Sequence, residues 1–363
     1  MSGIDRQREE KAMSARSWRE ILGILTDGND MSSDEAAWAM NEIFSDNATS
    51  AQIAAFGVAL KMKGPTPDEL SGLATGMLSH AKRVPFEGAA VDIVGTGGDR
   101  SGSVNISTMS SIVVAATGIP VIKHGNRAAS SKSGGADVLE ALGVKIALGP
   151  ESVAECVRQT GIGFCFAPVF HPSLRFASQA RGEIGIPTVF NILGPLTNPA
   201  QPSAGLIGCA FPDLVAVIAG VFAGRGASAL VVRGNDGLDE ITTADTTDVW
   251  VVAGGRSHET TIDPTKLGIE RVDPVALRGG DAEMNAVIAR AMFAGDPGPV
   301  RDAVLLNSAA ALVAFDLTAE EVDQDLHAKL AVALERVAET VDSGAASALL
   351  DRWVTVSNQL GAN

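Results

Sequence analysis

The sequence has no apolar run long enough to cross a membrane. None of its 363 residues falls in a stretch of ~18 consecutive apolar residues, the length that a spanning helix needs. Its first segment, Met1 to Arg19, is charged and polar, and it lacks the apolar core and small-residue cleavage site of a secretory signal. We therefore expect a cytoplasmic protein without a membrane partner, and we interpret residues 1–16 as a disordered tail.

Cysteine and positive charge are also scarce. Cys156, Cys165 and Cys209 show no metal-ligand spacing and lie among apolar residues, which is typical of buried thiols in a reducing compartment. Lys and Arg number 28 against 43 Asp and Glu, which gives a formal net charge of −15. A surface of this sign repels phosphate backbones and argues against nucleic acid as a partner. An anionic substrate must therefore meet a locally positive pocket.

The segment before residue 90 contains helical signals and no strand candidate. Three hydroxyl residues are each followed, three positions later, by a Glu or Gln that completes a capping box. The pairs are Ser32 with Glu35, Thr49 with Gln52, and Thr66 with Glu69. Apolar residues of helical period follow each pair, so we expect a group of helices here.

From residue 90 onward, short apolar strands alternate with helices. The strand candidates are 91–94, 119–122, 161–164, 206–208 and 229–232, with a helix expected from Asn105 to Thr117. This alternation predicts an α/β fold with a central, mostly parallel sheet flanked by helices. Residues 282–360 are helical again. The stretch 191–199 holds two prolines and a glycine, so we interpret it as a connection between two domains.

A glycine-rich motif follows the first predicted strand. Gly95-Thr-Gly-Gly-Asp99 precedes a helix that opens with Asn105-Ile106-Ser107-Thr108. Glycines let backbone N–H groups approach an oxyanion, and the helix start adds free N–H groups, so the motif suits phosphate. It is neither Gly-x-Gly-x-x-Gly nor a P-loop. The same residues also fit a plain turn followed by ordinary cap residues.

Further polar residues follow other strands. Lys123-His124-Gly125-Asn126-Arg127 comes after the second strand, and ligands bind at the carboxyl ends of parallel strands. Asp239-Glu240 comes after the fifth, where carboxylates and substrate phosphates together suit magnesium. Arg181 lies on a helix after His171, and its guanidinium can hold a carboxylate. Solvated loops and surface charges are the alternatives for each motif.

Five motifs in this order resemble anthranilate phosphoribosyltransferase. They are Gly-Thr-Gly-Gly-Asp (95–99), Asn-Ile-Ser-Thr (105–108), Lys-His-Gly-Asn-Arg (123–127), Asn-Ile-Leu-Gly-Pro-Leu-Thr-Asn-Pro (191–199) and Gly-Leu-Asp-Glu (237–240). The resemblance covers Trp18 to Trp353, nearly the whole chain.

The resemblance implies a fold and a reaction. It implies the fold of pyrimidine nucleoside phosphorylases, with a helical domain of residues 17–86 completed by a helical segment near 186–202, and an α/β domain of residues 87–185 and 203–363. It implies a homodimer. The reaction is transfer of the phosphoribosyl group from 5-phosphoribosyl 1-diphosphate (PRPP) to the amine of anthranilate, which releases diphosphate in the second step of tryptophan biosynthesis from chorismate.

The resemblance also implies residue roles. No residue is an acid–base catalyst, and Lys123, Asp239 and Glu240 stabilise the leaving group. Two Mg²⁺ ions per monomer are held by Ser107 with Glu240 and by Asp239 with Glu240. The PRPP residues are Gly95, Gly98, Asp99, Ser103, Asn105, Ile106, Ser107, Thr108, Lys123, His124, Gly125, Asn126, Arg127, Ala128, Ala129, Ser130, Ser131 and Gly135. The anthranilate residues are Gly95, Asn126, His124, His171 and Arg181.

Some positions differ from residues frequent in the family. Arg100 stands where glycine is frequent, Ser103 replaces threonine, and Arg233 replaces histidine. Val169 and Leu174 stand where members vary, which leaves the entry of anthranilate open.

Two other functions compete with this interpretation. A nucleoside phosphorylase of the same fold has no diphosphate to neutralise, so the Asp239-Glu240 pair argues against it. A catalytically silent relative that binds nucleic acid is disfavoured by the charge of −15.

Overall fold

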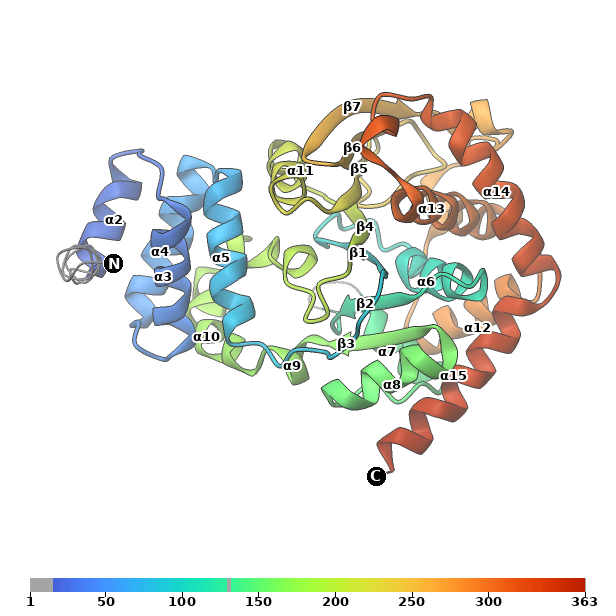
Figure 1. The fold of residues 1–363 in the computed structure, drawn as a ribbon, viewed down its shortest axis with the longest axis horizontal. Coiled ribbons are helices and arrows are strands. Elements are labelled where there is room, and N and C mark those ends of the chain that lie inside the picture. Colours follow the sequence, from blue (N-terminus) through green and yellow to red (C-terminus); the bar gives the residue numbers. More distant parts are fainter. Residues whose placement is uncertain (1–15, 129–131, 363) are drawn as a thin grey trace, which may run out of the picture. The chain divides into compact units, whose positions relative to one another are not determined.

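The structure, a computed structural model, describes residues 16–128 and 132–362 and divides into two compact units (Figure 1). The helical unit comprises the chain up to His80 together with Ser173–Leu193. The α/β unit comprises Ala81–Pro172 and Gly194–Asn363. The tail expected over residues 1–16 lies outside the described residues except for Arg16, which donates to the Asp34 carbonyl at 3.0 Å.

The helical unit is built from capped helices. They are α2 (Trp18–Thr26), α3 (Ser33–Phe44), α4 (Ser50–Lys63), α5 (Pro67–Ser79) and α10 (Arg175–Ile184). The three predicted capping boxes are present, and a fourth forms between Ser17 and Glu20. Each box satisfies free N–H groups of a first turn, so these helix starts follow from local sequence.

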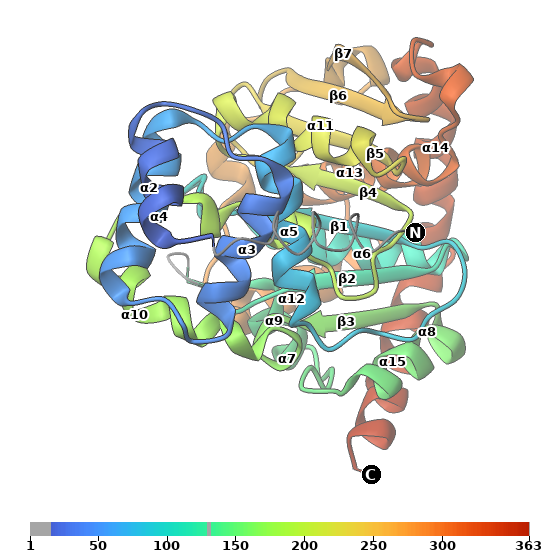
Figure 2. The ribbon, with the colours of Figure 1, turned by 60° about the vertical axis from the view of Figure 1, so that its left-hand side comes forward.

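The α/β unit contains a seven-stranded sheet in the order β3-β2-β1-β4-β5-β6-β7 (Figures 1 and 2). The strands are β1 (Val91–Gly95), β2 (Val121–Gly125), β3 (Ile162–Phe166), β4 (Ala204–Gly208), β5 (Ser228–Gly234), β6 (Thr247–Ala253) and β7 (Arg256–Ile262). The first five are parallel, and β6 and β7 add an antiparallel hairpin. The predicted mostly parallel sheet, and the absence of described strands before residue 90, are confirmed.

The hairpin of β6 and β7 was not predicted. Its signal is present in the sequence, because an apolar run over residues 249–253 is followed by Gly254-Gly255. Both glycines have positive φ, 57° and 76°. A two-residue glycine turn between strands is a hairpin pattern.

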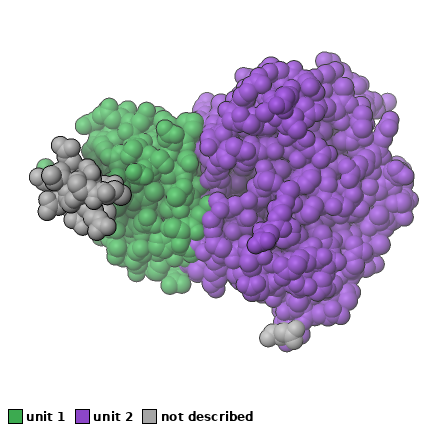
Figure 3. Space-filling view, viewed as in Figure 1, with its two compact units in different colours: residues 1–80, 173–193 green, residues 81–172, 194–363 purple. Residues whose placement is uncertain are grey.

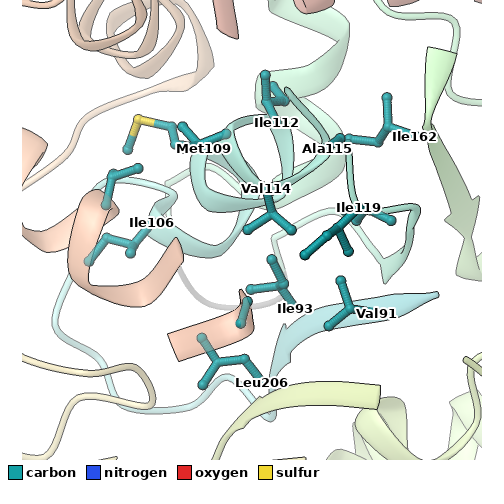
Figure 4. Close-up of a cluster of buried hydrophobic side chains, with 14 of the residues drawn as sticks. Val91, Ile93, Ile106, Met109, Ile112, Val114, Ala115, Ile119, Ile162 and Leu206 are labelled. Carbon is teal, nitrogen blue, oxygen red and sulfur yellow. The ribbon is translucent and has the colours of Figure 1, made fainter. Parts of the chain in front are cut away.

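Helices cover the sheet. They are α6 (Ile106–Ala116), α7 (Gly135–Ala141), α8 (Pro150–Thr160), α9 (Ala167–Phe170), α11 (Val215–Gly224), α12 (Ala282–Phe293), α13 (Pro299–Asp316), α14 (Leu326–Asp342) and α15 (Ala345–Gly361). Figure 4 shows part of the core, where Val91 and Ile93 of β1 and Leu206 of β4 lie beside side chains of α6. The three cysteines are buried and unpaired, as predicted. None of the described helices is long and apolar enough to span a membrane.

The chain returns to the helical unit earlier than we expected (Figure 3). We placed the returning segment near 186–202, whereas the helical unit contains 173–193. The reason is packing: α10 contacts α3 and α4, while the short 3-10 helix η3 (Gly194–Leu196) contacts β1 and β2. The prolines and glycine of 191–199 show that no helix continues through this stretch. They do not show which of its residues pack in the helical unit and which in the α/β unit.

Candidate active site

The carboxyl ends of β1, β2, β4 and β5 form one edge of the sheet. The register pairs Gly95 at the end of β1 with Gly208 at the end of β4. Gly208 pairs in turn with Val232 of β5. The motifs that follow these strands therefore meet, although they are far apart in sequence.

The glycine-rich motif wraps around Asp239. The N–H of Gly97 donates to Asp239 Oδ2 at 2.7 Å, and the N–H of Thr96 donates to the Gly208 carbonyl at 3.0 Å. Gly97 and Gly98 have φ of 68° and 92°, and Arg100 has φ of 60°. Such φ values favour glycine. Arg100 thus adopts, at some strain, a left-handed conformation that favours glycine.

Two strand-end glycines make room for Asp239. A Cβ on Gly95 would lie 2.2 Å from Asp239 Oδ2, and a Cβ on Gly208 would lie 1.6 Å from the Asp239 carbonyl oxygen. Neither distance is sterically allowed, so any side chain at these positions would displace the carboxylate or its backbone. Asp239, which is 8% exposed, therefore packs against the backbone of these two glycines.

Glu240 reaches the start of α6. Its Oε1 accepts from the Ser107 N–H at 2.9 Å, which places a carboxylate at the positive end of the helix. Burial raises the pKa of Asp239 to about 6, and the nearby Asp99 carboxylate adds to the rise. Burial and then the Asp239 charge raise the pKa of Glu240 well above its usual range. Two neighbouring carboxylates that repel each other, one buried and one half-buried, are stabilised by a cation.

Lys123 supplies a positive charge at this place. It is 3% exposed, and its Nζ donates to the Ser107 hydroxyl at 3.2 Å and to the Ile93 carbonyl. Burial lowers the pKa of the ammonium, and the nearby carboxylates Asp92, Glu240 and Asp239 offset part of that effect. The acidic protein therefore keeps one buried cation next to its buried carboxylates.

The helix-opening residues do more than cap α6. The Asn105 side chain makes no cap hydrogen bond; its Nδ2 donates to the Ser133 carbonyl at 3.2 Å, and its Oδ1 accepts from Asn285 at 2.9 Å. Thr108 Oγ1 is buried without a hydrogen-bond partner among the described residues. Ser103 Oγ accepts from the Ser101 hydroxyl at 3.1 Å. For Asn105, the alternative of an ordinary cap residue is wrong.

His124 and His171 form a buried pair whose ring centroids are 5.2 Å apart. His124 Nδ1 donates to the Gly194 carbonyl and His171 Nε2 to the Thr197 carbonyl, each at 2.9 Å. Burial lowers the pKa of His124 to about 4 and that of His171 to about 3. Both rings are therefore neutral at pH 7. Within the described chain, His124 Nε2 and His171 Nδ1 have no hydrogen-bond partner.

The loop after β2 is held by acidic side chains. Arg127 pairs with Asp137 at 2.8 Å and with Glu140 at 2.5 Å, and the Ala128 N–H donates to Asp137 at 3.1 Å. Asn126 Oδ1 accepts from the Arg127 N–H at 2.7 Å, and Gly135 begins α7. Ala129, Ser130 and Ser131 lie outside the described residues.

Arg181 belongs to the helical unit. It lies on α10, with its guanidinium 5.9 Å from the centre of the Phe190 ring. Burial lowers the pKa of this guanidinium, and no carboxylate pairs with it in the described part of the chain. The other predicted site residues that the structure describes all lie in the α/β unit.

Sequence reasoning missed several buried polar residues that support the site. Asp92 is 2% exposed and accepts from the His124 N–H at 3.1 Å and from Asn198 Nδ2 at 2.8 Å. Its signal was a charged residue inside an apolar strand. Asn285 and Asn307, on α12 and α13, are also buried and bonded to site segments.

Comparison with known proteins identifies the family. A family model described as the α/β domain of a glycosyl transferase family matches residues 87–347, and one described as its helical bundle domain matches residues 19–81. The anthranilate phosphoribosyltransferase of Nocardia farcinica is 73% identical over 94% of this chain and 99% of its own. That of Rhodococcus jostii is 66% identical over 96% of both chains.

Solved structures share the fold. The crystal structure of anthranilate phosphoribosyltransferase from Thermus thermophilus has a TM-score of 0.85 at 38% identity, covering 93% of this chain and 99% of that one. The Saccharomyces cerevisiae enzyme in complex with PRPP and Mg has a TM-score of 0.85 at 24% identity, covering 96% and 99%. With nearly its whole length matched in sequence and fold, this chain belongs to the anthranilate phosphoribosyltransferase family.

Proposed function

We propose that this protein transfers the 5-phosphoribosyl group of PRPP to the amine of anthranilate, giving N-(5-phosphoribosyl)anthranilate and diphosphate. This is the second step of tryptophan biosynthesis from chorismate. The observation that carries the proposal is the pair of the buried Asp239 and the half-buried Glu240, bonded to the glycine-rich motif through Gly97 and to the start of α6 through Ser107. Relatives that are 73% and 66% identical to this chain are named anthranilate phosphoribosyltransferase, the enzyme of this reaction.

The residues present fit magnesium. Asp239 is buried and Glu240 is half-buried; the two repel each other and have raised pKa values, as expected of carboxylates that need a cation. No group of three or more His, Cys, Asp or Glu side chains is arranged to hold a metal among the described residues. Magnesium commonly uses one or two carboxylates plus substrate phosphates. Ser107 with Glu240 would hold one ion and Asp239 with Glu240 a second; bound magnesium neutralises charge on the departing diphosphate.

The protein's own groups support departure of the diphosphate. The Gly95–Asp99 motif holds the Asp239 carboxylate through the Gly97 N–H, and Lys123 adds a buried ammonium beside Ser107. Donors fixed in advance around developing charge need no reorganisation, and loss of one such donor costs about 2.7–4 kcal/mol of transition-state stabilisation. Positive charge builds on the ribose as the bond breaks, as in glycoside cleavage.

The acceptor needs little chemical activation. An arylamine is neutral at pH 7, so its lone pair is free and no strong base is required. His124 and His171 are neutral, and each has one buried nitrogen that no described residue occupies and that can accept a hydrogen bond. Arg181, which has no carboxylate partner in the described chain, would hold the anthranilate carboxylate. The remaining task is positioning.

A fluorescence assay tests the proposal. Protein, anthranilate, PRPP and Mg²⁺ are mixed, and anthranilate fluorescence is followed; we expect a loss of signal that a chelator abolishes. Phosphate-dependent release of base from a nucleoside, without PRPP turnover, would instead identify a nucleoside phosphorylase. A salt-sensitive gel shift with nucleic acid would indicate a silent binding relative. We further propose a cytoplasmic homodimer, which sedimentation and cell fractionation test.

A further inference from the structure

A single asparagine interrupts the apolar run of α13. Asn307 is 1% exposed and lies among the buried residues Leu305, Leu306, Ala309 and Ala310. An amide in such surroundings is costly unless its hydrogen bonds are made. Its presence therefore calls for a specific set of partners.

Two of the three described hydrogen bonds of the Asn307 side chain go to one residue 66 positions away. Asn307 Oδ1 accepts from the Ile241 N–H at 3.0 Å, and Asn307 Nδ2 donates to the Ile241 carbonyl at 2.8 Å. The third goes to the Ala303 carbonyl of the same helix, at 2.9 Å. The amide thus holds both the N–H and the carbonyl of one residue, much as a neighbouring strand does in a sheet.

Ile241 directly follows Asp239-Glu240. The two carboxylates themselves accept from N–H groups of the glycine-rich motif and of the α6 start, through Gly97 and Ser107. Consecutive Cα atoms are about 3.8 Å apart, so movement of Ile241 is passed directly to Glu240. Asn307 therefore ties the carboxylate turn to a buried helix of the α/β core.

We propose that Asn307 is a positioning residue: it fixes the backbone that presents Asp239 and Glu240 to magnesium and the PRPP diphosphate. The inference rests on the proposed function. Two neighbouring carboxylates that repel each other separate unless their backbone is restrained. Partners behind metal ligands change metal affinity or activity by about 10–100-fold when removed.

The neighbouring positions provide matched controls. Ser308 is 0% exposed, and its Oγ has no hydrogen-bond partner among the described residues, so Ser308→Ala removes a buried polar atom and no described bond. Leu306 is also 0% exposed, and Leu306→Ala leaves a cavity in the same helix while the amide bonds to Ile241 remain. A purely structural role for Asn307 would make Asn307→Leu behave like Leu306→Ala.

The experiment compares these variants by metal use and by local exchange. We expect Asn307→Leu to raise the Mg²⁺ concentration for half-maximal activity and the KM for PRPP by about 10–100-fold, with the KM for anthranilate unchanged. Mn²⁺ binding in the presence of PRPP, followed by electron paramagnetic resonance, should weaken in parallel. Hydrogen exchange of the Ile241 N–H should accelerate. Ser308→Ala should match wild type in all of these measurements. Leu306→Ala should lower the Tm but leave metal use and the exchange of the Ile241 N–H unchanged.

Other outcomes decide the matter as well. If Asn307→Leu does not fold, Asn307→Asp retains the acceptor for the Ile241 N–H and should show a smaller shift in the same direction. Unchanged Mg²⁺ and Mn²⁺ dependence, or an equal shift in Leu306→Ala, would overturn the inference. Lack of anthranilate turnover by wild type would defeat the proposed function, while Mn²⁺ binding and exchange would still report on Asn307.

Discussion

Adding one methyl group at Gly208 should disable the enzyme without unfolding it. Gly208 ends β4, and a Cβ there would lie 1.6 Å from the carbonyl oxygen and 2.6 Å from the carbonyl carbon of Asp239. Both neighbours are backbone atoms, which cannot rotate away as a side chain does. To reach an ordinary contact of 3.4 Å, the Asp239 backbone must move by about 1.8 Å.

The expected loss of catalytic activity follows from the displacement of the Asp239 backbone. A misplacement of about 1 Å at a reacting centre can reduce a rate by about 10²-fold. Gly208→Ala should therefore lower kcat/KM for PRPP by at least about 100-fold, which corresponds to about 2.7 kcal/mol of transition-state stabilisation. Overpacking costs about 1–3 kcal/mol of folding stability, so the variant should remain folded at 25 °C with a lower Tm.

The assay has a control on the same strand. A Cβ on Gly205 would make its closest approach to the flexible end of Ile207, at 2.8 Å. Gly205→Ala should therefore keep kcat/KM within a few-fold of wild type. Anthranilate fluorescence at varied PRPP and Mg²⁺ measures the kinetics, and circular dichroism gives the Tm. A Gly208→Ala enzyme with wild-type kcat/KM would refute the argument that the absence of a side chain at Gly208 sets the position of Asp239.

Three further predictions follow from the site. Asp239→Asn and Glu240→Gln should each lower kcat by about 10²-fold or more in the fluorescence assay at saturating Mg²⁺, because a proposed ligand of the magnesium at the leaving group is lost. Arg181→Ala should raise the KM for anthranilate at least about tenfold, whereas Arg175→Ala, an exposed change on the same helix, should not. The lowered pKa of His124, about 4, means that the unfolded state binds more protons below about pH 6.5. The free energy of unfolding should therefore decrease from about pH 6.5 toward 4, and urea titrations should show a weaker decrease in His124→Asn.

Local signals in the sequence were sufficient for much of the architecture. Helix starts at Ser32, Thr49 and Thr66 were predictable because a capping box lies within four consecutive residues. The strand ends that carry Gly95 and Lys123 were predictable because apolar runs precede the polar motifs. The polar motifs were expected at the carboxyl ends of these strands, where parallel sheets bind ligands, and the structure describes them there.

The parts that escaped prediction depend on distant partners. Asn105 has the residue type of a cap, yet its side chain bonds the Ser133 carbonyl and Asn285, which is 180 residues away. Asn307 in an apolar helix gives no sign of its partner Ile241. A buried amide shows that some partner exists, but only the fold determines which one.

Neutral groups, rather than charges, set the geometry of this site. The charged residues Asp239, Glu240 and Lys123 create strong forces in a buried place, and those forces alone would drive like charges apart. Gly208 leaves space for the Asp239 backbone that any side chain would fill, and Asn307 restrains the residue after Glu240. Repulsion that cannot relax by movement can be relieved by binding cations, which is how, under the function that we propose, a protein of net charge −15 would gather magnesium and an anionic diphosphate at one edge of its sheet. Disturbing either restraint should therefore weaken metal binding before it destabilises the fold.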